Sequence, residues 1–223
     1  MTPGKPQPKR RASSQEQIDR ILDATVTLLD QRTLSDMSIY AIAAQADIPP
    51  SLVYHFFPQL ADVLATLAQR VFTELDAVLG EAPMPGIDCL SWTVLVEQLE
   101  ERFQQYYQSH PAARELLLGA HELVGIRQAD RQHDSLLGSS LGTYIARYYQ
   151  LPALPLDVDI FTLAMQTADK LLAIDHQQHG QLTAPMRREA RRMMVAYLGL
   201  YLPSVLPRIA ETEVVDGADC QSV

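Results

Sequence analysis

The chain has 223 residues, 47% of them apolar, and carries a formal net charge of −9. This composition can build a buried core, while no apolar run approaches the roughly 20 residues that span a bilayer. Residues 1–12 lack the apolar stretch of a secretory signal, so we expect a cytoplasmic protein. The acidic balance excludes a protein that coats nucleic acid non-specifically. Cys89 and Cys220 are too few for a disulfide framework or a structural zinc site.

Residues 1–13 contain Lys5, Lys9, Arg10 and Arg11 and no acidic residue. We expect a flexible basic arm here, because the stretch is rich in proline and has no periodicity. Basic and acidic residues balance through Phe57, so the whole net charge of −9 lies beyond it. Arg10 and Arg11 could therefore reach DNA phosphates while the acidic remainder stays clear, although a merely solubilising disordered tail has the same composition.

Two helices are predicted before residue 47. The first spans about residues 14–32, because Ser13 or Ser14 offers an N-cap and apolar residues then recur at helical spacing. Ser38 caps a short second helix. The buried side of that helix is expected to be Ile39, Ile42, Ala43 and Ala46.

The stretch from Asp47 to Pro50 ends one helix and starts another. Asp47 tolerates the left-handed conformation found at helix ends, and Pro49 and Pro50 cannot donate hydrogen bonds to the preceding helix. Proline suits the first turn of a new helix, where its missing N–H costs nothing. We therefore predict a third helix over residues 51–57, held at a sharp angle to the second, and a fourth over residues 58–80 that serves as a connector.

Beyond residue 80 a Pro/Gly-rich loop is followed by periodic segments punctuated by proline. They predict helices at roughly residues 90–109, 111–124, 127–150, 156–179 and 184–206, and an acidic disordered tail over residues 211–223. No strand-like alternation occurs in the sequence. The expected fold is all-α with about nine helices: an N-terminal three-helix helix-turn-helix domain over residues 14–60 and a larger C-terminal helical bundle over residues 81–210.

Two short helices joined by a tight turn, after a longer helix and a basic arm, have the layout of a helix-turn-helix DNA reader. In that geometry the second short helix enters the major groove, and base edges are met by the residues near its N-terminus: Pro50, Ser51, Leu52 and His55. Hydroxyl groups suited to phosphate lie at Ser38, Tyr40 and Tyr54. A generic helical hairpin with aromatic core residues explains the same spacing, so geometry alone leaves both interpretations open.

The segment SIYAIAAQADIPPSLVYHFFPQLADVL, residues 38–64, resembles the TetR-type DNA-binding domain. The residues in register with that family's pattern are Ser38, Ile39, Ile42, Ala43, Ala46, Ile48, Val53, Tyr54, Phe57 and Leu64. The match covers about residues 15–64. Asp47, Pro49, Leu52 and Leu60 depart from the pattern, and Leu60 stands where the family usually has a lysine that contacts phosphate. These departures affect the expected base preference more than DNA binding itself.

The resemblance implies a sequence-specific DNA-binding transcriptional regulator, a repressor released from a palindromic operator by a small apolar or aromatic ligand. It also implies that residues 81–210 bind the ligand and that the last two helices pair with those of a second copy. Broad apolar faces support a homodimer: Ile160, Leu163, Ala164, Thr167, Leu171, Met193, Met194, Tyr197, Leu200 and Tyr201.

The residues that could line a mostly apolar ligand cavity are aromatic or lie near aromatic residues, although ordinary core packing explains each of them singly. They are Trp92, Phe103, Tyr106, Tyr107, His121, Tyr144, Tyr148, Phe161, Met165 and Asp169. We expect such a ligand to act by changing the packing of residues 60–79 against residues 111–124, which would alter the spacing of the two DNA readers.

Other classes of protein have less support. The sequence has no glycine-rich phosphate loop, no nucleophile motif and no credible carboxylate pair, so we expect no enzyme and no cofactor. His121, Glu122, His133 and Asp134 have no recognised ligand spacing, so we expect no metal. The alternative to a regulator is a helical protein-interaction module with a degenerate DNA reader, which the departures Leu52 and Leu60 suggest.

Overall fold

The computed structural model describes residues 8–80, 91–119 and 137–209. Within these ranges the chain is all-helical, as predicted, and the extended backbone pairs only in an isolated bridge between Tyr149 and Arg208. None of the helices described there has both the length and the apolarity of a membrane span. The elements are α1 (Pro8–Leu29), the 3₁₀ helix η1 (Leu34–Asp36), α2 (Ile39–Gln45), α3 (Pro50–Phe56), α4 (Leu60–Gly80), α5 (Trp92–Ser109), α6 (Pro111–Leu118), a helix over residues 137–148, α8 (Ile160–His179) and α9 (Ala184–Leu198).

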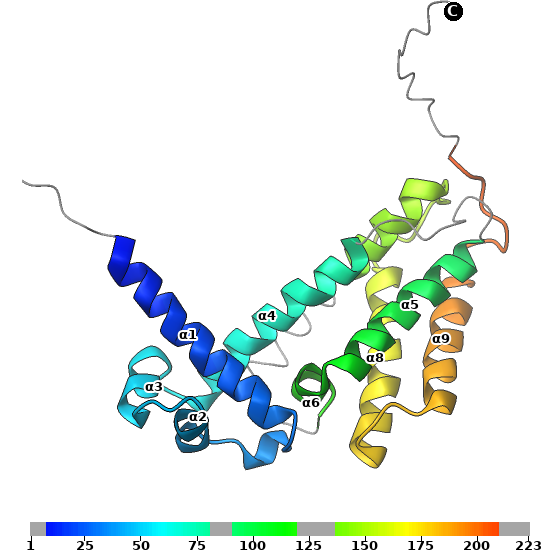
Figure 1. Ribbon diagram of the computed structural model, residues 1–223. Coiled ribbons are helices and arrows are strands. Elements are labelled where there is room, and N and C mark those ends of the chain that lie inside the picture. Colours follow the sequence, from blue (N-terminus) through cyan, green and yellow to red (C-terminus); the bar gives the residue numbers. More distant parts are fainter. Residues whose placement is uncertain (1–7, 81–90, 120–136, 210–223) are drawn as a thin grey trace, which may run out of the picture.

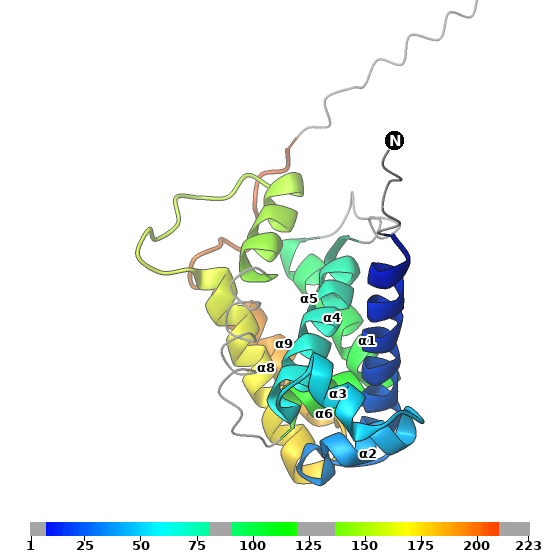
Figure 2. The ribbon, with the colours of Figure 1, turned by 90° about the vertical axis from the view of Figure 1, so that its left-hand side faces the viewer.

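The helices lie on two sides of α4 (Figure 1). Helices α1, α2 and α3 are grouped on one side, and α5, α6, α8 and α9 lie on the other. The same grouping is visible when the molecule is turned by 90° (Figure 2), where α8 and α9 lie behind α3 and α6. The long helix α4 therefore touches both groups, and it packs against α1, α5 and α6.

Helix α1 begins at Pro8, which corrects the expectation of a flexible arm through residue 13. Proline is favourable at a first helical position, and Lys9, Arg10, Arg11 and Ala12 are good helix formers. The helix therefore starts ahead of the serine caps that the sequence offers at residues 13 and 14. Arg10 and Arg11 lie on the first turns of this helix, with their side chains outside the described part of the structure.

The first three helices share one apolar core with the start of α4. Ile21 from α1, Ile42 from α2, Val53 from α3 and Leu64 from α4 are all fully buried. The predicted buried side of α2 is confirmed, since Ile39, Ile42, Ala43 and Ala46 are all buried. Small residues on α2 allow α1 and α3 to approach closely, so the short helices α2 and α3 are held by packing rather than by their own propensity.

Helix α4 begins at Leu60, two residues later than predicted. The Gln59 N–H donates to Asp62 Oδ2 at 2.9 Å, and this reciprocal contact satisfies an otherwise unpaired N-terminal donor. Val63, Leu67 and Leu75 lie along one apolar stripe of this helix and are buried. Through these buried side chains α4 packs against both groups of helices, so a change in its position would move one group relative to the other.

Helices α8 and α9 form a hairpin that is closed by a short turn. Gly180 ends α8 in the left-handed conformation, with φ 67°. Asp175, fully buried, accepts hydrogen bonds from the Thr183 N–H at 2.5 Å and the Thr183 hydroxyl at 3.1 Å, which fixes the start of α9. At the other end of α8, Asp159 caps the helix, so α8 starts at Ile160 rather than near residue 156.

Candidate nucleic-acid interface

The start of α2 is fixed by Ser38. Its hydroxyl oxygen accepts a hydrogen bond from the Ala41 N–H at 3.2 Å, so this residue caps the helix as predicted. Tyr40, in the first turn, has 66% of its surface exposed. Because its oxygen accepts the capping bond, the Ser38 hydroxyl can still donate its own proton.

The turn between α2 and α3 has the predicted left-handed residue, Asp47, with φ 52°. The Ile48 N–H donates to the Ala43 carbonyl at 3.0 Å, which closes the end of α2. Arg20 of α1 donates to the Asp47 carbonyl at 3.3 Å. Sequence reasoning missed Arg20, because no local pattern signals a contact across 27 positions. The turn is therefore held both by its own backbone and by α1.

Helix α3 begins with the two prolines as predicted. Pro49 is the N-cap residue in extended conformation, Pro50 occupies the first turn, and the Leu52 N–H donates to the Pro49 carbonyl at 2.9 Å. Val53 is fully buried against the core. Since this anchor fixes the rotation of the helix, the outer face of α3 is set by the fold rather than by a ligand.

The outer face of α3 presents polar side chains. Ser51, Tyr54 and His55 are exposed, whereas Pro50 and Leu52 are half-buried. The rings of Tyr54 and Tyr40 meet edge to face, with centroids 6.4 Å apart. The structure thus brings together hydroxyl groups from α2 and α3 on one surface, and the imidazole of His55 lies on the same short helix.

Part of the predicted ligand cavity lies in the described residues. Phe103, Tyr107, Met165 and Asp169 do line a common cavity, but its volume is about 20 Å³, close to the minimum for one water molecule. Trp92 belongs to the core, where its ring N–H donates to the Pro203 carbonyl at 2.8 Å.

The other predicted cavity residues have separate positions. Tyr144 and Tyr148 meet edge to face, with centroids 5.6 Å apart, on the helix over residues 137–148. Phe161 packs where a Cβ atom on Gly142 would overlap its ring. His121 lies outside the described residues. Tyr106 faces a different cavity.

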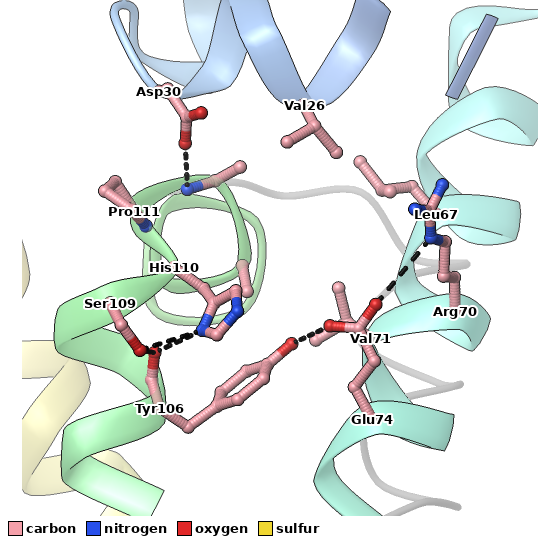
Figure 3. A pocket seen from close by; sticks show the side chains of 12 residues that line it. Val26, Asp30, Leu67, Arg70, Val71, Glu74, Tyr106, Ser109, His110 and Pro111 are labelled. Atoms are coloured by element: carbon pink, nitrogen blue, oxygen red, sulfur yellow. Dashed lines mark hydrogen bonds and ion pairs between the residues drawn. The ribbon is translucent and has the colours of Figure 1, made fainter. Parts of the chain in front are cut away.

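That cavity has a volume of about 370 Å³ and lies where α1, α4, α5 and α6 meet. Figure 3 shows the Tyr106 hydroxyl directed at Glu74, where it donates to Oε2 at 2.6 Å. Burial and this hydrogen bond raise the pKa of Tyr106, so the hydroxyl stays protonated. Of the residues around this cavity the sequence signalled only Tyr106, because the walls come from four helices and the lining residues are spread along the chain from Val26 to Ala113.

The expected dimer face lies on α8 and α9. Leu163, Met193, Leu200 and Tyr201 are exposed, with Met193 at 46% and Leu200 at 75%. Thr167, Leu171 and Tyr197 are half-buried. Ile160, Ala164 and Met194 are instead buried inside the chain, so they cannot add area to a dimer interface. The helical period places these three on the inner side of the same two helices.

Comparisons with known protein sequences give a partial match. No protein-family model matches the chain. The HTH-type transcriptional repressor KstR of Mycolicibacterium smegmatis is 28% identical over 74 residues, which are 33% of this chain and 36% of that protein. The chain thus matches about a third of the length of this curated relative.

Solved structures match over most of the chain. A TetR-family transcriptional regulator from Streptomyces coelicolor is 25% identical, with a TM-score of 0.62 over 83% of this chain and 99% of that chain. A TetR transcriptional regulator from Rhodococcus sp. RHA1 is 12% identical, with a TM-score of 0.60 over 82% and 97%. The multidrug binding protein EbrR complexed with imidazole is 16% identical, with a TM-score of 0.59 over 81% and 93%.

Proposed function

On the premise that this chain has the TetR-family fold and a TetR-type helix-turn-helix sequence, we propose that it is a sequence-specific DNA-binding transcriptional regulator. The observation that carries the proposal is the outer face of α3, where Ser51, Tyr54 and His55 are exposed while Val53 anchors the helix. Ser51 and His55 can hydrogen-bond base edges in the major groove. Tyr40 and Tyr54 supply hydroxyl groups for backbone phosphates that flank the major groove.

The regulator acts as a homodimer on a palindromic operator. The exposed apolar side chains of α8 and α9, among them Leu163 and Met193, are suited to a two-fold interface with the same helices of a second copy. Two copies related by a two-fold axis present two α3 helices in opposite directions. A palindrome is the DNA sequence that has the same symmetry.

A small ligand releases the protein from its operator. The description of KstR as a repressor supports repression rather than activation, and the complex of EbrR with imidazole supports a small molecule as the effector. A ligand shifts the equilibrium only if it binds one conformer better than the other, and here the conformers differ in the separation of the two α3 helices. Measuring that separation with and without ligand tests the mechanism; unchanged separation and mobility would refute it.

The experiment that tests the function is selection of bound duplexes from a randomised DNA pool at moderate salt. We expect a palindrome to be enriched by the unaltered protein and lost with Tyr54→Ala and with Ser51→Ala. Ser139→Ala, at an exposed position outside the reader, is the matched control for Ser51→Ala and should recover the same palindrome. No enrichment at any salt concentration would favour the protein-interaction module instead.

A further inference from the structure

The cavity at the junction of α1, α4, α5 and α6 has the properties of a ligand site. Its volume of about 370 Å³ falls in the range of small-molecule pockets. Its apolar walls include Val26 of α1, Leu67 and Val71 of α4, and Ala113 of α6. In Figure 3 the polar groups lie around the same space as these apolar side chains. An apolar body with one polar end therefore fits the space.

The charged groups around this cavity make it acidic. Glu74 and Asp30 line it directly. Arg70 also lines it, but its guanidinium lies 2.7 Å from Asp23 Oδ1 and 3.7 Å from Glu74 Oε1. Among the described lining residues the guanidinium of Arg70 is therefore already paired, and the Asp30 carboxylate adds a further negative charge. Such a field attracts a cation and repels an anion.

Several of the polar groups that line the cavity are hydrogen-bond acceptors. His110 Nδ1 lies 2.9 Å from the Tyr106 carbonyl oxygen. The Ser109 hydroxyl oxygen also lies 3.0 Å from this nitrogen. A carbonyl cannot donate, so in the tautomer that makes the carbonyl contact Nδ1 is the donor and Nε2 is an acceptor. Figure 3 shows that second nitrogen facing the space between α5 and α4. The carboxylates of Asp30 and Glu74 are acceptors as well, so the site suits a ligand that donates.

An aromatic surface completes the site. The rings of Tyr106 and His110 are stacked, with centroids 4.2 Å apart and planes at 19°. A flat ligand can stack on this pair, and a cation held near the face of Tyr106 gains a further attraction. We propose that this junction cavity binds a small aromatic amine in its protonated form, with the ammonium group at Glu74.

An occupant here would touch the contacts that join the two groups of helices. The Tyr106 hydroxyl joins α5 to Glu74 of α4, and Asp30, directly after α1, accepts a hydrogen bond from the Ala112 N–H of α6 at 3.0 Å. An ammonium group that competes for the Glu74 carboxylate weakens the first contact and changes the packing of α5 against α4. This link to operator release rests on the proposed function, whereas binding of the amine does not.

Calorimetric titration of the full-length, DNA-free protein near neutral pH tests the site with three probes of one shape. They are naphthylmethylamine, naphthylmethanol and naphthoate, which are cationic, neutral and anionic. We expect the amine to bind once per chain and about tenfold or more tighter than the other two. Equal affinities for the three probes, or no binding of the amine, would overturn the proposal.

Two variants locate the binding. Glu74→Gln keeps an acceptor for the Tyr106 hydroxyl but removes the charge, and it should weaken amine binding about tenfold without affecting the alcohol. Val26→Phe fills the apolar end of the cavity and should weaken all three probes, provided that its thermal unfolding matches that of the unaltered protein. Asp76→Asn, an exposed site on the same helix outside the cavity lining, is the matched control. Unchanged amine affinity in Glu74→Gln would refute the site even if Val26→Phe failed to fold.

A second titration separates binding from regulation. If the selected operator is released by the amine from the unaltered protein but not from Glu74→Gln, the cavity is the effector site. If the amine binds but the operator is not released, the binding site is confirmed and the proposed role of the cavity in operator release is refuted. The calorimetric titration contains no DNA. Its result therefore tests amine binding even if no operator is found in the DNA selection.

Discussion

Asp47 is a non-glycine residue in the left-handed conformation, with φ 52°, at the turn between α2 and α3. An L side chain pays on the order of 1 kcal/mol in this region, and aspartate less than alanine. Asp47→Gly should therefore raise the free energy of unfolding by about 0.5–1 kcal/mol, and Asp47→Ala should lower it by a similar amount. The Arg20 contact to the Asp47 carbonyl survives in both variants, because the acceptor is backbone.

Urea denaturation of the two variants and the unaltered protein measures this difference. A glycine variant less stable than the alanine variant would contradict the explanation from backbone strain. Loss of the carboxylate, which lies 3.9 Å from Arg20 at an exposed position, should cost almost nothing.

Glu100, on α5, is a second residue whose environment has a measurable consequence. Burial raises its pKa to about 7, against the opposing hydrogen bond from Gln104 and the charge of Arg191. The unfolded chain releases this proton near pH 4.5, so between about pH 4.5 and 7 the native state binds more protons. The free energy of unfolding contributed by this group therefore falls as pH rises through that window, by up to about 1.4 kcal/mol per pH unit.

Glu100→Gln should remove this fall, because the amide has the shape of the protonated acid and does not ionise. Above pH 7 we expect the free energy of unfolding of the variant, measured by chemical denaturation, to be about 2–3 kcal/mol higher than that of the unaltered protein. Glu97→Gln, exposed on the same helix, should keep the original pH dependence. Parallel stability curves for Glu100→Gln and the unaltered protein would refute the assignment.

At the scale of elements, α6 is the piece that joins the two groups of helices. Glu115 Oε1 accepts a hydrogen bond from the Leu34 N–H of η1 at 2.9 Å, while Oε2 lies 2.9 Å from His176 Nε2 of α8. On the same helix, the Ala112 N–H donates a hydrogen bond to the carboxylate of Asp30, which directly follows α1. One carboxylate therefore connects the segment before α2 with the hairpin that carries the expected dimer face.

Glu115→Ala should lower the free energy of unfolding by about 1–3 kcal/mol, because it leaves partly buried donors unpaired. We also expect faster amide hydrogen exchange in residues 34–45, which the lost contact no longer holds. Combining it with His176→Ala in a double-mutant cycle should give a coupling of about 0.5–3 kcal/mol. Exchange rates in residues 34–45 unchanged from those of the exposed-site control Glu97→Ala would contradict the role of Glu115.

The features that could be predicted from the sequence depend on neighbouring residues. The Ser38 cap, the left-handed Asp47 and the prolines that start α3 each involve contacts within a few positions, and each prediction was confirmed. Helix ends were less accurate. Helix α1 starts earlier than predicted at Pro8, and α9 ends at Leu198 rather than near residue 206. Periodicity marks which residues face the core but does not fix where the last turn stops.

Contacts between distant elements could not be predicted. Nothing near Glu115 in the sequence indicates Leu34 as its partner, and nothing near Glu74 indicates Tyr106. The predicted cavity residues were chosen for being aromatic or near aromatic residues, a criterion that does not separate a residue lining a cavity from one buried in the core. The junction cavity was missed because its walls form only when α1 and α4 are placed against α5 and α6.

At the scale of the whole molecule, the assembly depends on the exposed apolar face of α8 and α9. Leu163→Glu and Met193→Glu place a charge where a second copy would bury an exposed apolar side chain. We expect each variant to sediment as a monomer in analytical ultracentrifugation and to lose about tenfold or more in operator affinity, since both half-sites must be read together. Ala77→Glu, exposed on α4, should leave both properties unchanged. A Met193→Glu protein that remains dimeric would place the interface elsewhere.

Trp92 gives the molecule a built-in optical reporter. It is the one tryptophan in the chain, it is almost fully buried on α5, and its ring N–H donates to the Pro203 carbonyl. Indole emission lies at shorter wavelength in an apolar environment than in water, so undocking of the segment after α9 would shift the spectrum to the red. Tyrosines, not tryptophan, occupy the outer face of α2 and α3. Fluorescence of the unlabelled protein therefore reports on the environment of Trp92 at the start of α5 alone. It can be recorded while DNA is added to bind at α2 and α3, or while a ligand is added.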